Sequence, residues 1–117
     1  MGHTILLQVK RGGKATGGDR DNSIMLSMEK ELDALASEME IAPPSRFYNT
    51  WGDSAAGHQA ITAILGMLRD QPGRFPFPTE ASRQHWRDQL LEELSHCEAE
   101  LRAAAEAGHQ FRLRIVA

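Results

Sequence analysis

Cysteine is almost absent from this sequence: Cys97 is the only one among 117 residues, so no disulfide can form within the chain. Disulfides persist in oxidising compartments, and their absence favours a reducing one, with the cytoplasm as the expected location. Long hydrophobic runs are also missing, since the longest apolar stretches fall far short of the roughly 18 residues that a membrane-spanning helix needs. The residues after Met1 lack the basic start and apolar run of a signal peptide. We therefore expect no membrane partner.

Positive charge is scarce and is not concentrated in one stretch. The formal net charge is −3, with 13 lysines and arginines against 16 acidic residues. Residues 27–40 and 79–108 each carry a net charge of −4, whereas residues 1–22 and 109–117 each carry +2. Because the chain has no long basic stripe, we do not expect it to bind nucleic acid.

The composition is that of an ordinary globular protein. Hydrophobic residues make up 41% of the chain and charged residues 25%. A chain of this length can bury one core without disulfide or metal crosslinks. We therefore expect residues 1–117 to form a single domain.

Alternating apolar residues predict strands near both ends of the chain. Residues 3–10 alternate with a period near two, and residues 110–116 alternate more strictly. A two-stranded sheet is marginal by itself. A third strand over residues 46–51 would make the sheet more stable. Alternatively, two subunits could join their strand edges and form a homodimer. Residues 11–22 contain four glycines and no large apolar residue, which predicts a mobile loop.

Three segments between these strands have helical periodicity. The first begins at Ser23 or Ser27 and ends at Met39, and the second spans residues 55–70. The third spans residues 79–107, with Thr79 as its N-cap, and would be about 42 Å long. The order β-α-α-α-β predicts a helix-rich α+β single domain, with a small sheet formed by the terminal strands and the helices on one face.

The glycine-rich segment between the first strand and the first helix has the position of a phosphate-binding loop. A Walker A loop places a glycine six residues before its lysine and a serine or threonine directly after it. Around Lys14 these positions hold Gln8 and Ala15. We therefore interpret the segment as a connector.

An aromatic loop leads into the second predicted helix and holds the candidate ligand-binding residues, Tyr48, Trp51, Asp53 and His58. The aromatic side chains could form a pocket wall, and Asp53 could orient His58 for acid–base chemistry. The structural interpretation is that Phe47 and Trp51 pack on the core, Asp53 caps the helix and His58 lies on its apolar stripe. We favour this second interpretation.

No catalytic or metal-binding set stands out from the remaining residues. His96 and Cys97 are neighbours on a predicted helix, where their side chains point about 100° apart and cannot share a proton. Glu92, Glu93, His96 and Glu100 have helical spacing, but a metal site in a helical bundle needs ligands from a facing helix as well. We expect no catalytic residue, no metal and no cofactor.

Two stretches resemble a recurrent pattern in small bacterial proteins. Residues 32–47, LDALASEMEIAPPSRF, combine a helix with a proline-containing stop and a phenylalanine. Residues 51–69, WGDSAAGHQAITAILGMLR, continue with an aromatic residue, an acid, a glycine and a short helix. Some proteins of this type are similar to immunity proteins, which neutralise a toxin, and the resemblance carries no catalytic residue onto this chain.

The sequence therefore favours a non-catalytic module that binds another protein, in an immunity or inhibitor role. The acidic helix faces suit a basic partner, and free strand edges leave surface to be used. The alternative is a small-molecule binder or enzyme with a site around Trp51 and His58.

Overall fold

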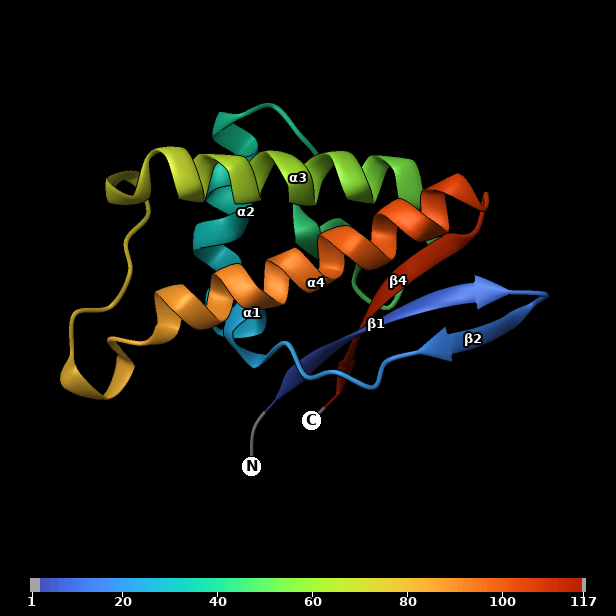
Figure 1. Ribbon diagram of the computed structural model, residues 1–117, viewed down its shortest axis with the longest axis horizontal. Coiled ribbons are helices and arrows are strands. Elements are labelled where there is room, and N and C mark those ends of the chain that lie inside the picture. The colour runs from blue at the N-terminus through green and yellow to red at the C-terminus, as the bar shows by residue number, and fades with distance from the viewer. Residues whose placement is uncertain (1–2, 117) are drawn as a thin grey trace.

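The computed structural model describes residues 3–116 and contains a four-stranded antiparallel sheet with the strand order β2-β1-β4-β3. Its central pair joins β1 (Thr4–Arg11) to β4 (Gln110–Val116), with Leu7 opposite Leu113. The helices pack on one face of this sheet (Figure 1). The α+β class and the pairing of the terminal strands are thus confirmed.

The two faces of the central strands differ because successive side chains in a strand point to opposite sides. The inner face carries the buried residues Ile5, Leu7, Val9, Phe111 and Leu113. The outer face carries Leu6, Gln8 and Lys10 of β1 together with Arg112 and Arg114 of β4. Helix packing therefore covers the apolar face and leaves the basic one uncovered.

The prediction of a loop over residues 11–22 is wrong at β2 (Lys14–Gly17), which forms a hairpin with β1. Gly12 and Gly13 both have positive φ angles, 56° and 80°, as a two-residue hairpin turn requires. The strand has no apolar alternation because its two inward residues are Thr16, which is half-buried, and Lys14, which is exposed. That residues 11–22 are mobile remains a prediction.

The first predicted helix is two helices, α1 (Ser23–Ser27) and α2 (Glu29–Glu38), separated at Met28. Met28 has φ −109° and ψ 25°, outside the helical range, and its side chain is buried in the core. The interruption lets α1 lie on α4 while α2 packs against the segment η1 (Pro44–Phe47).

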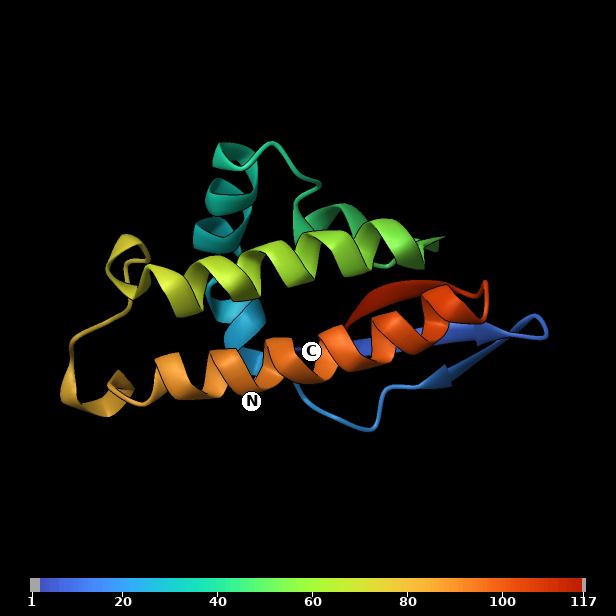
Figure 2. The same ribbon diagram turned by 45° about the horizontal axis from the view of Figure 1, so that its top comes forward.

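The remaining helices are α3 (Ser54–Asp70) and α4 (Trp86–Glu106), which pack against each other (Figure 2). Helix α3 agrees with the prediction for residues 55–70. Helix α4 begins later than predicted, because residues 79–85 have no large apolar side chain to bury and are all exposed. Short 3₁₀ turns at η2 (Pro72–Arg74) and η3 (Ala81–Arg83) lead into it instead.

The prediction of a strand over residues 46–51 is also wrong. This stretch contains the end of η1, and the strand that follows, β3 (Gly52–Asp53), is only two residues long. The η1 turn buries Phe47 in the core with its ring 4.7 Å from that of Phe111. No helix among the described residues is long and apolar enough to cross a membrane.

Candidate interaction face

The outer face of the sheet presents Trp51 together with two cationic side chains. The Arg112 guanidinium carbon lies 4.4 Å from the centre of the Trp51 ring, and the Lys10 ammonium nitrogen lies 5.6 Å from it. Both distances are within the range of cation–π attraction. All three residues are half-buried, so part of each remains available to another molecule.

Cross-strand pairing explains why these residues meet. Lys10 and Arg112 both occupy outward positions in the neighbouring strands β1 and β4. Trp51 directly precedes β3, whose Gly52 pairs with Phe111, so the indole reaches Arg112 from the next strand. The Arg112 Nε also donates a 2.9 Å hydrogen bond to Oε1 of Gln8, which lies opposite it in β1. Arg112 is therefore held on two sides.

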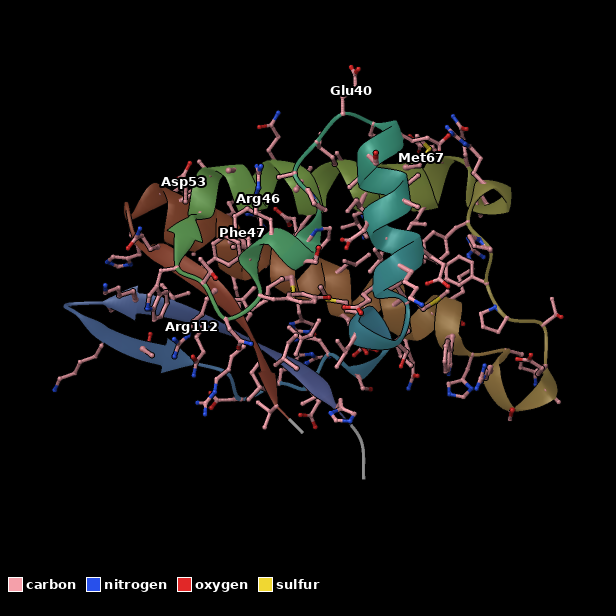
Figure 3. All side chains as sticks on the ribbon, turned by 180° about the vertical axis from the view of Figure 1, so that it is seen from behind. Glu40, Arg46, Phe47, Asp53, Met67 and Arg112 are labelled. Atoms are coloured by element: carbon pink, nitrogen blue, oxygen red, sulfur yellow. The ribbon has the colours of Figure 1, made fainter. Side chains whose placement is uncertain are left out.

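The charge of this face is positive. Lys10, Arg112 and the exposed Arg114 point outward, and β1, β2 and β4 place no acidic side chain on this side. Asp53 of β3, opposite Gln110, adds one acidic residue at the edge. Half-buried Leu6, opposite Arg114, adds apolar area. Figure 3 shows Arg112 at the sheet, near the β3 segment that ends at Asp53. We call the set Leu6, Lys10, Trp51, Arg112 and Arg114 the basic face.

The four candidate residues of the aromatic loop have four different environments. Trp51 lies on the basic face, so the interpretation that it packs on the core is wrong. Tyr48 lies near Glu29 and Asp33, and burial, followed by the charge of these two carboxylates, raises the pKa of its hydroxyl. Phe47, in contrast, is in the core as expected.

Asp53 and His58 also take separate partners. The Asp53 carboxylate accepts a 3.3 Å hydrogen bond from the backbone N–H of Ala55, which confirms it as the N-cap of α3. His58 is half-buried, and its Nε2 lies 2.7 Å from Oε2 of Glu98 on α4. The group that orients His58 is therefore Glu98 rather than Asp53, and these contacts lend no support to a shared ligand site.

A groove that the sequence did not indicate separates the β1–β2 hairpin from α4. Its volume is about 520 Å³, and its lining includes Val9, Thr16, Ala99, Glu100 and Ala103. The predicted loop contributes here, because residues 16–20 form one wall. Thr16 and Gly17 of this wall are held by backbone pairing with β1, which the glycine-rich sequence does not reveal through apolar periodicity.

Burial changes the pKa of two side chains of α4, Cys97 and Glu100. Burial raises the pKa of the Cys97 thiol to about 12 and also raises the pKa of the Glu100 carboxyl. Cys97 is 2% exposed, and its Sγ lies 3.7 Å from the Met25 sulfur. The thiol is therefore uncharged at neutral pH and is not an activated nucleophile.

Glu93 of α4 has a structural role at the start of α1. Its carboxylate accepts hydrogen bonds from the backbone N–H groups of Met25, at 2.9 Å, and Ile24, at 3.3 Å. It thereby satisfies two of the free donors at the start of α1, the part of a helix that favours negative charge. Among residues 3–116, no three histidine, cysteine or acidic side chains gather as metal ligands.

No family model matches the chain, and comparison with curated proteins and with solved structures yields no match. The resemblance to small bacterial immunity-type proteins therefore remains an expectation, and the function is argued from the side chains described above.

Proposed function

We propose that this chain is a non-catalytic protein-binding module and that the basic face is its main contact surface. The observation that carries this proposal is the position of Trp51 beside Lys10 and Arg112 on the uncovered side of the sheet. The corresponding partner surface is acidic and includes an apolar patch that covers the indole. An inhibitor or immunity role, in which binding blocks the active surface of a partner, is the most concrete form of this function.

The residue types on the basic face are those that contribute most to protein interfaces. Tryptophan and arginine are enriched among the residues whose truncation costs the most binding energy. The contacts of Arg112 with Gln8 and Trp51 already restrict its side chain, so less conformational entropy is lost when a partner binds. The face is thus partly ordered before it meets its partner.

Positive and negative charges lie on different surfaces of the chain, which favours association with a partner in one orientation. The basic face lies on the strands, whereas segments 27–40 and 79–108, which contain α2 and α4, each carry a net charge of −4. Opposite charges on two partners increase association rates and select orientation. The acidic helices form a second surface, which is complementary in charge to a basic region of the same partner or of another protein.

Affinity capture from a lysate of the cells that encode the chain tests the proposal, followed by calorimetry with the purified partner. We expect Trp51→Ala and Arg112→Glu to weaken binding at least tenfold, with a loss of affinity as salt is raised. The control is Arg87→Glu, which makes the same charge change at an exposed position on α4 and should leave affinity within about twofold.

Two results would contradict the proposal. One is equal binding by the wild type and the Arg112→Glu variant, which would place the contact elsewhere. The other is capture of no partner together with stoichiometric self-association in light scattering, which would make the chain a self-assembling dimer.

A further inference from the structure

The free edge of the sheet at β2 has backbone groups that point away from β1. The hairpin closes at the pair formed by Arg11 and Lys14, and Val9 pairs with Thr16 two residues further on. In an antiparallel pair, only alternate residues direct their N–H and C=O groups toward the neighbouring strand. The intervening residue Ala15 therefore directs both of its groups outward, toward the position of one more strand, and regular strand geometry ends at Gly17, whose φ is 83°.

The groove described above lies directly inside this edge. Thr16 and Val9 form its strand side, and the exposed alanines Ala99 and Ala103 form its helix side. The methyl groups of these alanines leave a volume of about 520 Å³ between α4 and the hairpin. A strand added beside β2 would direct alternate side chains into this space.

The charges at the hairpin define what such a strand would contain. Arg11 and Lys14 lie on the groove side of the hairpin tip, and Lys10 lies on the opposite side. The acids of the groove lining, Asp19 and Glu100, lie away from the tip and share the lining with Arg20. Acidic side chains next to the tip would pair with these cations, whereas an apolar side chain fits beside Ala103. A second copy of this chain is a poor match, because pairing two β2 edges would bring these like charges close together.

The edge at β2 is short, with four residues, but it is not blocked. Residues 14–17 include no proline, and Lys14 is the only charged residue in β2. Natural proteins commonly protect an edge strand with charges, prolines, bulges or a covering segment. Because no proline removes the outward N–H of Ala15, one more strand can still pair with this edge.

From the edge, the groove and the charges together, we infer that β2 accepts an extended, acidic segment of a partner protein as a fifth strand of the sheet, with an apolar side chain in the groove. This site is distinct from the basic face and does not require it. Main-chain hydrogen bonds to Ala15 provide affinity, and the groove selects the inward side chain.

Fluorescence anisotropy with labelled eight-residue peptides tests the inference. The peptides carry glutamate at the inward positions beside the hairpin tip and valine, leucine or phenylalanine at the inward position beside Ala103, and a matched set carries lysine in place of glutamate. We expect at least one acidic peptide to bind and its lysine counterpart to bind at least tenfold more weakly. Methylating the backbone nitrogens that face β2 should abolish binding, because these donors would form the new ladder.

Two variants examine the edge and the groove separately. Ala15→Pro removes an outward N–H without removing a hydrogen bond to β1, and Ala103→Trp fills the groove. Each should weaken binding at least tenfold, whereas Ala55→Trp, at an exposed alanine of α3, should leave it unchanged. Circular dichroism confirms that each variant is folded.

Failure of every acidic peptide to bind would overturn the inference, as would unchanged affinity in the folded Ala103→Trp variant. Arg112→Glu, which alters the basic face, should leave peptide binding within about threefold. This difference separates failure of the edge site from failure of the proposed function.

Discussion

Gly57 of α3 lies directly against the ring of Phe111 in β4. A Cβ atom added to Gly57 would be 2.3 Å from Cζ and 2.4 Å from Cε1 of that ring, far inside the contact distance. Phe111 is 1% exposed and also packs on Phe47, so the ring has little room to move. The glycine therefore sets how closely α3 approaches the sheet.

Gly57→Ala should lower the free energy of unfolding by about 1–3 kcal/mol, because overpacking forces the helix or the ring to shift. Urea unfolding followed by circular dichroism measures this loss. Gly66→Ala is the matched control on the same helix, since a Cβ there meets nothing within 4 Å. That change should stabilise the protein by roughly 0.5–1 kcal/mol, because alanine favours the helix. Equal effects at the two positions would contradict the prediction.

Glu93→Gln should change how stability depends on pH. Burial raises the pKa of Glu93 above its ordinary value of 4.5, although the hydrogen bonds from Met25 and Ile24 partly oppose this. The folded state thus holds the proton more tightly than the unfolded state. The resulting stabilisation is present at low pH and is lost as the pH rises through the raised pKa.

The measurement is the difference in the free energy of unfolding between the wild type and Glu93→Gln at pH 4 and pH 7. The stability of the wild type relative to the variant should fall with rising pH, by about 1.4 kcal/mol for each unit by which the pKa is raised. Glu106→Gln, at an exposed position on α4, is the control and should show a smaller pH dependence. A constant difference for Glu93→Gln would mean that its carboxyl is not perturbed.

Cys97 should be unreactive in the native protein. With a pKa of about 12, roughly one thiol in ten thousand is ionised at pH 8, and its 2% exposure blocks access as well. A thiol-specific disulfide reagent should therefore react with one equivalent in denaturant and far more slowly in buffer. Rapid reaction of the folded protein would show that the helices around Cys97 open readily.

His58→Gln distinguishes a structural role from a catalytic or ligand-binding one. The variant loses the contact between His58 and Glu98, which joins α3 to α4 at a partly exposed position. We expect a loss of stability below about 1 kcal/mol and unchanged binding of the partner of the basic face. Loss of partner or ligand binding without a change in the thermal midpoint would instead assign His58 to a functional site.

Sequence patterns were sufficient for elements that bury a regular stripe. The alternation in β1 and β4 indicated both strands and their inward residues, and Asp53 marked the start of α3. The patterns failed where backbone pairing, not apolar burial, forms the element. Residues 14–17 read as a loop, although Gly12-Gly13 is a turn signal that could have indicated the β1–β2 hairpin.

The candidate site depended on contacts between distant residues. Trp51 was grouped with its sequence neighbours, but its partners Lys10 and Arg112 come from strands at opposite ends of the chain. His58 likewise pairs with Glu98, 40 residues away. Such contacts follow from strand register and helix packing, which local periodicity does not determine.

The pairing of β1 with β4 has a consequence for how the chain folds. Thr4 lies opposite Val116 and Lys10 opposite Gln110, so every contact of the central pair closes a loop of about one hundred residues. Proteins dominated by such non-local pairings fold slowly, because the entropy of loop closure must be lost before the contacts form. During synthesis, β1 has only β2 as a partner until β4 leaves the ribosome, and the apolar side of the sheet is completed last.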